Sequence, residues 1–329
     1  MDYLLEVENL TIKFFTKEGT VHAVDKVSFK LKKGEILGIV GESGSGKSVS
    51  MLGILGLIKG PQGKVIDGEI VFDGQDLMKM SDAKLREIRG KKVAMVFQDP
   101  MSSLNPVLKI KDQIGEVLKT HLGMDKASAK NRTIELLDKV GIPSPSKRID
   151  DYPHQFSGGM RQRVMIAMAL ACEPQILIAD EPTTALDVTI QSQIVDLIKD
   201  LQNELKMSVI WITHDLSLLA RIAKRINVMY AGSIIETADI KEIYSEPKHP
   251  YTIGLIRSIP RLDEVRSREL FSIEGLPPDL LSESQHCLFA PRCKNVINKC
   301  WEEKPNLLKT NSPTHFSSCY RWEETSTLI

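Results

Sequence analysis

The stretch GESGSGKS, positions 41 to 48, gives the strongest indication of the fold. It follows the apolar run EILGIV, which is typical of a buried strand, and it leads into SVSMLGILGLI, which is typical of a helix. The spacing of Gly41, Gly46, Lys47 and Ser48 fits the phosphate-binding pattern G-x-x-x-x-G-K-[ST] in the strand, loop and helix context that this pattern requires. The alternative is a glycine-rich turn that contains a lysine by chance, and the agreement of strand, loop and helix argues against it. The sequence therefore predicts a site for a nucleoside triphosphate.

The chemistry of this loop follows from its residue types. Glycines let backbone N–H groups curl around phosphate oxygens, and the start of the following helix adds its positive dipole. We expect Lys47 to reach the β- and γ-phosphates and the Ser48 hydroxyl to bind Mg²⁺. The residues of this loop that we expect to contact the nucleotide are Gly41, Ser43, Gly44, Ser45, Gly46, Lys47, Ser48 and Val49.

A second apolar run ends in two carboxylates. ILIAD, positions 176 to 180, is typical of a buried strand, and Glu181 directly follows its last residue, Asp180. A carboxylate at a strand end beside a phosphate loop can hold Mg²⁺, which we expect of Asp180, and Glu181 is then placed to polarise the attacking water. An acidic turn is the ordinary alternative for an isolated pair, but EPTTALD follows here and favours a catalytic pair.

FSGGMRQR, positions 156 to 163, contains a second helix start suited to an anion. A serine followed by two glycines at a helix start offers a hydroxyl and free N–H groups to phosphate. The chain would then carry two phosphate-binding surfaces but a single lysine loop. This makes sense if Ser157, Gly158 and Gly159 cap the nucleotide held by another molecule, whereas the alternative is a flexible turn.

Taken together, these motifs resemble those of the ABC-type ATPases. GESGSGKS, VFQDP, FSGGMRQR, ILIADEP, TALD and WITHD occur in the order of that family, and the match covers residues 1 to about 240. The resemblance implies an α/β fold with a mostly parallel core sheet, an antiparallel β subdomain and a helical subdomain. It also implies that two such subunits pair head to tail, with ATP held between the phosphate loop of one and the serine and glycines of the other.

The resemblance assigns further roles to single residues. Gln98 matches the glutamine that senses Mg²⁺ and the attacking water, and His214 matches the histidine that contacts the γ-phosphate. Asp187, in the TALD turn, would link the two sites across the dimer. An aromatic residue near the N-terminus stacks on adenine in this family, and Phe14 is our choice, with Phe15 as the alternative.

One motif departs from the family pattern. The commonest signature is LSGGQ, whereas here Phe156 replaces the leucine and Met160 replaces the glutamine. The serine and glycines that touch phosphate are kept. We therefore expect phosphate binding at this motif to persist.

The chain divides into two predicted parts. We expect an ATPase domain over residues 1–240, with a helical subdomain at about 98–172, and a small irregular extension over residues 241–329 that binds a metal. SDAKLREIRG is expected to form a short helix capped by Ser81. QDPMSSLNPVLKI carries two prolines and is expected to form a loop, and the family resemblance implies that this region faces membrane subunits.

The extension carries a second resemblance. HPYTIGL and EGLPPDL closely resemble the tail of the ATP-binding subunits of peptide and nickel importers. This implies an ATPase that powers peptide import with two membrane permease subunits, a second ATPase subunit, which we expect to be a paralogue, and an extracytoplasmic binding protein. A nickel or other small-solute importer is the close alternative. A soluble ABC ATPase that acts on DNA or ribosomes typically has two cassettes or a long coiled coil, and an iron–sulfur redox sensor would not need the complete hydrolytic set.

Four of the five cysteines lie in the extension, at Cys287, Cys293, Cys300 and Cys319. Their intervals differ from the paired C-x-x-C pattern of most structural zinc sites, although four thiolates suit either zinc or an iron–sulfur cluster. Tail cysteines of this kind are associated with a [4Fe–4S] cluster in peptide-importer ATPases, so the resemblance implies one here. A zinc site and four unliganded thiols are the alternatives. Cys172 lies in an apolar run and is expected to be a core residue.

Composition limits the partners and the location. Acidic and basic residues balance at 43 each, so no overall field favours nucleic acid. The start MDYLLEVENL lacks the basic segment and apolar core of a secretory signal, and the longest apolar runs are shorter than the ~20 residues that span a bilayer. We therefore expect a peripheral protein at the cytoplasmic face of the membrane, without a transmembrane segment and without a nucleic-acid partner.

Overall fold

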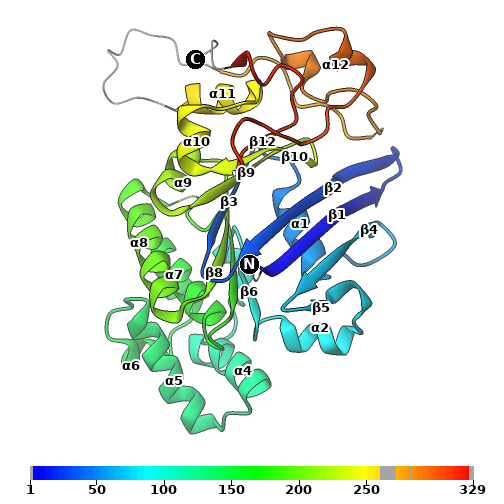
Figure 1. Cartoon of the computed structure of the whole chain (residues 1–329). Helices are drawn as coiled ribbons and strands as arrows, with labels where there is room; N and C mark the ends of the chain where they lie inside the picture. The colour runs from blue at the N-terminus through cyan, green and yellow to red at the C-terminus, as the bar shows by residue number, and fades with distance from the viewer. Residues whose placement is uncertain (1–2, 185, 260–271, 282, 326–329) are drawn as a thin grey trace.

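The computed structural model describes residues 3–184, 186–259, 272–281 and 283–325 (Figure 1). In chain order the elements are β1 (Tyr3–Phe15), β2 (Thr20–Lys32), β3 (Ile36–Val40), α1 (Lys47–Ile54), β4 (Gly63–Phe72), β5 (Gln75–Asp76), η1 (Leu77–Lys79), α2 (Asp82–Ile88), β6 (Val93–Val96), α3 (Pro100–Ser103), α4 (Ile110–Leu122), α5 (Lys126–Lys139), α6 (Pro145–Arg148), η2 (Pro153–Gln155), α7 (Gly158–Ala169), β7 (Ile176–Asp180), α8 (Val188–Leu205), β8 (Ser208–Thr213), α9 (Leu216–Ile222), β9 (Arg225–Tyr230), β10 (Ser233–Asp239), α10 (Ile240–Ser245), α11 (Pro250–Arg257), η3 (Ala290–Arg292), α12 (Lys299–Glu302), β11 (Leu308–Lys309) and β12 (Phe316–Ser317).

A mixed sheet forms the centre of the molecule. Among the described residues it has eight strands in the order β11-β12-β10-β9-β3-β8-β7-β6. The strands from β9 to β6 in this order are parallel, and β10, β12 and β11 continue the sheet through antiparallel pairs. Every residue of β3, β7 and β8 is buried, because these parallel strands lie inside the sheet and are covered on both faces. The predicted parallel core is confirmed.

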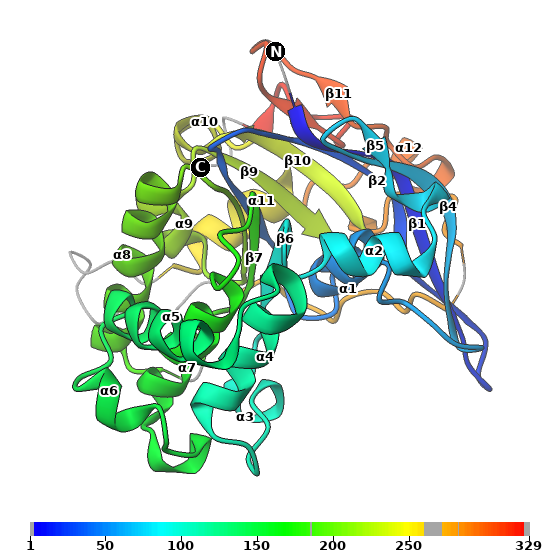
Figure 2. The same cartoon turned by 90° about the horizontal axis from the view of Figure 1, so that it is seen from below.

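A smaller antiparallel sheet packs beside the central one. Its strand order is β2-β1-β4-β5, and Phe14 on β1 pairs with Val21 on β2 and with Gly63 on β4. Figure 2 shows this sheet on one side of the central strands and helices α7 and α8 on the other. The buried residues Met51 and Ile54 of α1 belong to the apolar cluster that joins the two sheets. The predicted antiparallel β region is thus confirmed.

The helices α3 to α7 lie between β6 and β7 in the chain and confirm the predicted helical region. Ser81 caps α2 as expected, since its hydroxyl accepts the N–H of Lys84 at 3.5 Å. The expected loop in QDPMSSLNPVLKI begins instead with the one-turn helix α3. Its cause is local, because Asp99 accepts the N–H of Met101 at 2.8 Å and Pro100 occupies the first helical position.

The extension covers the end of the central sheet opposite α4 to α6 (Figure 1). Strand β12 pairs with β10, which joins the extension to the central sheet directly. Phe289 is buried against Tyr230 of β9 and Tyr251 of α11, with ring centroids 5.3 and 5.6 Å away. The division of the chain at residue 240 stays a prediction. No helix in the described part of the chain is both long enough and apolar enough to cross a bilayer.

A buried carboxylate holds the extension to the sheet. Glu236 on β10 is fully buried, and its Oε1 lies 2.6 Å from His315 Nε2. The same carboxylate accepts the backbone N–H groups of Lys248 at 2.5 Å and His249 at 3.0 Å. A buried carboxylate is tolerated only when it is hydrogen-bonded, and here three donors from two segments of the extension meet one strand.

We expect Glu236→Ala to lower the free energy of unfolding by about 3 kcal/mol, because it leaves three buried donors without an acceptor. Urea unfolding followed by circular dichroism measures this change. Lys59→Ala is the matched control, since its ion pair with Asp82 is more than half exposed and should contribute less than about 1 kcal/mol. Equal, small losses in both variants would contradict the role given to Glu236.

Candidate active site

The predicted site residues meet at one edge of the central sheet. The strands β3, β8, β7 and β6 are parallel neighbours, so their carboxyl ends lie side by side. The phosphate loop follows β3, His214 follows β8, Glu181 follows β7 and Gln98 comes shortly after β6. Ligands of open α/β sheets bind at the carboxyl ends of the strands, and this edge is such a place.

The phosphate loop takes a path that requires glycine at two positions. A Cβ on Gly41 would lie 2.2 Å from the carbonyl oxygen of Met229. Gly46 has a φ of 96°, and a Cβ there would lie 2.5 Å from the carbonyl oxygen of Ala23. The two predicted glycines thus let the loop fold tightly against β2 and β9. Of the other loop residues, Ser45 is buried, Val49 is partly buried, and Ser43 and Gly44 are exposed.

Lys47 points back along this loop. Its Nζ donates to the carbonyl oxygens of Gly41 at 2.8 Å and Glu42 at 2.9 Å. Burial lowers the pKa of Lys47, and the nearby carboxylates, Glu181 first among them, oppose this shift. A buried ammonium group is stabilised by an anion, so the position favours a phosphate ligand.

Ser48 and Asp180 form a polar pair at the base of the loop. The Ser48 hydroxyl donates to Asp180 Oδ1 at 2.9 Å, and Asp180 is 5% exposed. Burial raises the pKa of Asp180, while the hydrogen bond from Ser48 lowers it. A hydroxyl beside a buried carboxylate provides the hard oxygen donors that Mg²⁺ prefers.

Glu181 is held in an unusual backbone conformation at the end of β7. Its φ is 45°, in the left-handed region that a glutamate rarely adopts, which is typical of functional sites. Its carboxylate accepts hydrogen bonds from Gln98 Nε2 at 3.0 Å and Thr184 Oγ1 at 2.8 Å, and it lies 3.3 Å from His214 Nδ1. The structure therefore brings together Glu181, Gln98 and His214. Sequence analysis missed Thr184, although it stands in the EPTTALD segment.

The residues expected from the second nucleotide surface lie elsewhere. The segment 157–159 begins α7, where Ser157 Oγ accepts the N–H of Met160 at 3.3 Å. Asp187 caps α8 by accepting the N–H of Ile190 at 2.9 Å. Within the described ranges, no hydrogen bond joins either segment to the phosphate loop.

The two aromatic candidates for adenine differ in burial. Phe14 is partly buried on β1 between the neighbouring strands, whereas Phe15 is 41% exposed. The roles of both rings stay predictions, as do those of the other site residues.

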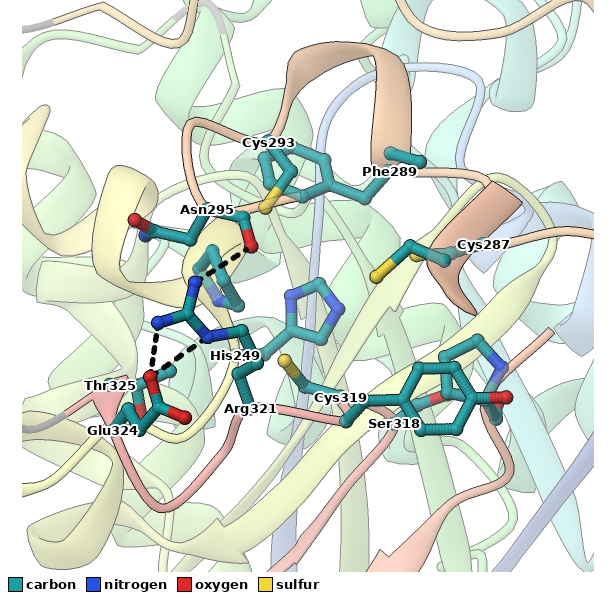
Figure 3. A pocket seen from close by; sticks show the side chains of 15 residues that line it. His249, Cys287, Phe289, Cys293, Asn295, Ser318, Cys319, Arg321, Glu324 and Thr325 are labelled. Atoms are coloured by element: carbon teal, nitrogen blue, oxygen red, sulfur yellow. Dashed lines mark hydrogen bonds and ion pairs between the residues drawn. The ribbon is translucent and has the colours of Figure 1, made fainter. Parts of the chain in front are cut away.

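The four cysteines of the extension line one cavity of about 50 Å³. Figure 3 shows the sulfur atoms of Cys287, Cys293 and Cys319 turned toward this cavity from different segments. The N–H of Cys287 donates to the carbonyl oxygen of Cys300 at 2.9 Å, which ties two of these segments together. All of the cysteines are free thiols.

Burial favours the protonated form of three of these thiols, Cys287, Cys293 and Cys319. It raises the pKa of Cys287 to about 11 and that of Cys319 to about 12, and it also raises the pKa of Cys293. Among the residues that the structure describes, no three or more His, Cys, Asp or Glu side chains form a group that could hold a metal ion. The cavity thus has the predicted donor atoms without a formed ligand geometry, and the structure does not support the expected metal-binding domain.

Comparison with known sequence families gives two matches. The ABC transporter family matches residues 24–184. The family described as the oligopeptide/dipeptide transporter C-terminal region matches residues 235–300. The second match contains Tyr251 and Cys287, so the extension is itself a feature of a known family.

The chain is similar to curated proteins over nearly its whole length. It is 52% identical over 313 residues to the oligopeptide transport ATP-binding protein OppD of Bacillus subtilis, covering 95% of this chain and 87% of that protein. It is 50% identical over 304 residues to the dipeptide transport ATP-binding protein DppD of Escherichia coli, covering 92% of each. An ATP-binding cassette solved as a dimer in a post-hydrolysis state, bound to ADP and Pi, matches with a TM-score of 0.64 and 31% identity over 72% of this chain and 98% of its own. The chain therefore belongs to the ATP-binding subunits of the oligopeptide and dipeptide ABC transporters, the ATPases that power peptide import.

Proposed function

We propose that this chain hydrolyses ATP at the phosphate loop, with Glu181 as the base, and thereby drives the import of di- or oligopeptides. The observation that carries the proposal is the meeting of Ser48 with Asp180, and of Gln98 and His214 with Glu181, at one edge of the sheet. A soluble ATPase acting on DNA or ribosomes has no support, because residues 235–300 match the C-terminal region of peptide transporters.

Each residue has a distinct task in this proposal. Lys47 binds the β- and γ-phosphates, and Glu181 takes the proton of a water that Gln98 and His214 orient toward the γ-phosphate. Ser48, Asp180 and Gln98 would hold Mg²⁺, which supplies neutralisation of phosphate charge when bound. Catalysis then rests on positioning and on charge stabilisation rather than on covalent chemistry.

A second subunit completes the site in this proposal. Ser157, Gly158 and Gly159 at the start of α7 would face the nucleotide of the partner, and Asp187 would link the two sites. The dimeric solved cassette that resembles this chain supports such pairing. Phe156 is buried, so the change from the common leucine concerns packing, while Ser157 stays at the surface.

The surface after Gln98 is suited to membrane partners. Met101 is 60% exposed and Val107 is 76% exposed, although both are apolar. Apolar side chains exposed along one segment are suited to contact another protein. We propose that this segment faces the permease subunits, of which the transporter has two, at the cytoplasmic face of the membrane. The second ATPase subunit in this proposal is a paralogue. An extracytoplasmic binding protein supplies the peptide.

The four-cysteine cavity fits a soft metal in its donor atoms. Cys300 lies in α12, whereas Cys287, Cys293 and Cys319 lie in connecting segments, and thiolate groups suit an iron–sulfur cluster or zinc. We propose a [4Fe–4S] cluster, with zinc as the alternative. Binding would release the protons of the coordinating thiols and would order a segment that has little apolar core of its own.

We expect Glu181→Gln to bind ATP like the wild type but to turn it over about 100- to 10,000-fold more slowly, because the amide keeps the shape and loses the base. Phosphate release at saturating ATP and binding of a fluorescent ATP analogue measure the two effects. Glu173→Gln is the matched control, since Glu173 is an exposed carboxylate paired with Arg132. Near-normal hydrolysis in Glu181→Gln would remove Glu181 from the proposed role.

We expect iron and sulfide to copurify with the chain under anaerobic conditions, at about four of each per chain with a visible chromophore. Cys319→Ser should lose both. Cys172→Ser should keep both, because Cys172 does not line the cavity. Stoichiometric zinc without a chromophore would rule out the cluster.

We expect cells that carry Lys47→Ala to lose uptake of labelled di- and oligopeptides and to keep uptake of nickel. The reason is that loss of the buried ammonium group removes the phosphate contact on which hydrolysis depends. Loss of nickel uptake alone would instead favour the small-solute alternative, and no change in either would contradict the importer role.

A further inference from the structure

The second residue of the phosphate loop, Glu42, is held by three other residues at once. The Nζ of Lys47 donates to the carbonyl oxygen of Glu42 at 2.9 Å. The backbone N–H of Glu42 donates to the Tyr251 hydroxyl, also at 2.9 Å. Arg292 donates to both of its carboxylate oxygens, at 2.7 and 3.0 Å. Lys47 belongs to the loop itself, whereas Tyr251 and Arg292 belong to the extension. The extension therefore contacts the nucleotide loop directly.

Arg292 is held in place by groups outside the phosphate loop as well as by Glu42. Its side chain is 4% exposed, and the five N–H groups of a guanidinium are all used here. Besides the two bonds to Glu42, they reach the carbonyl oxygens of Glu274 at 3.1 Å and Ile273 at 3.3 Å and the Tyr230 hydroxyl at 3.4 Å. A two-pronged arginine–carboxylate contact fixes direction as well as distance. The cysteine-bearing segment thus presents one rigid cation to the loop.

Tyr251 is equally fixed. It is fully buried, and its ring lies 4.7 Å from that of Tyr230 and 5.6 Å from that of Phe289. Its hydroxyl is therefore held in one place, where it accepts the N–H of Glu42. The contact acts on the backbone of the loop, while Arg292 acts on the side chain.

The charge of Glu42 explains why the loop needs the arginine. Glu42 belongs to the proposed phosphate loop, its carboxylate is near enough to Lys47 to act on the charge of that residue, and its side chain is only 30% exposed. Without Arg292 this negative charge would oppose a triphosphate, because like charges in a partly buried site are screened weakly by water. With Arg292 the charge is neutralised and the loop is anchored.

We propose that Tyr251 and Arg292 are positioning residues for ATP, which hold Glu42 so that the extension forms part of the nucleotide site. This inference rests on the proposed role of the phosphate loop. It gives the extension a direct effect on ATP affinity.

The test measures the Kd for ATP with purified full-length chain. Arg292→Gln should raise the Kd about tenfold, because it exposes the triphosphate to an unpaired carboxylate. Adding Glu42→Gln in the same chain should bring the Kd back to within about threefold of the wild type, since the repelling charge is then gone. Tyr251→Phe should raise the Kd about threefold through the loss of one hydrogen bond.

Two matched controls separate this effect from general damage. Lys294→Gln changes a cation two residues from Arg292, whose exposed ion pair with Glu274 does not reach the loop. Tyr244→Phe removes a buried hydroxyl for which the described residues offer no hydrogen-bond partner. Both controls should bind ATP like the wild type. Arg292→Lys, which keeps the charge but loses the fork, should lie between the wild type and Arg292→Gln.

The outcomes are distinct. Wild-type affinity in Arg292→Gln and Tyr251→Phe, beside loss of binding in Lys47→Ala, would overturn this inference alone. Normal binding in Lys47→Ala would overturn the proposed phosphate site itself. A double variant that binds as weakly as Arg292→Gln would show that Arg292 acts on folding instead of on the charge of Glu42. If Arg292→Gln fails to fold, Arg292→Lys and Tyr251→Phe decide the question.

Discussion

Two opposite charges are buried at one edge of an apolar sheet, and the other residues of the site are arranged to stabilise them. Lys47 and Asp180 are each 5% exposed, and burial lowers the pKa of the first and raises that of the second. Such groups are costly unless they have partners. The glycine loop gives Lys47 carbonyl oxygens, and Ser48 gives Asp180 a hydroxyl. A triphosphate with its metal has the complementary charges, so the same arrangement that is costly alone is suited to that ligand.

The extension is tied to the ATPase part by polar groups that are themselves buried. Glu236 joins β10 to His315, and Arg292 joins the cysteine-bearing segment to Glu42. Both contacts are directional, unlike the apolar packing of Phe289 around them. The extension is too small to bury much apolar surface of its own, so it needs such polar contacts in order to keep one orientation. As a result, the cysteine cavity is close to the nucleotide loop: Cys293, which lines the cavity, directly follows Arg292, which contacts Glu42.

Much of this arrangement could be predicted from the sequence. The spacing around Lys47 and the carboxylates after ILIAD indicated the nucleotide site, because their chemistry depends on residue type and local order. The helix in QDPMSSLNPVLKI was missed, since the two prolines of this segment were interpreted as signs of a loop, whereas Asp99 and Pro100 start a helix. Thr184 was missed for another reason: a threonine in a turn carries no signal until the structure places it beside Glu181.

The phosphate loop, the order of the strands along the chain and the four thiols can be predicted from the order of the amino acids alone, because they depend on neighbouring residues. The packing of the chain in three dimensions sets which strand lies beside which, and hence that Gln98, Glu181 and His214 meet. The same packing brings Arg292 to Glu42, a pair separated by 250 positions. Contacts of this kind depend on how sheets and segments pack, and packing brings together residues that no local pattern connects.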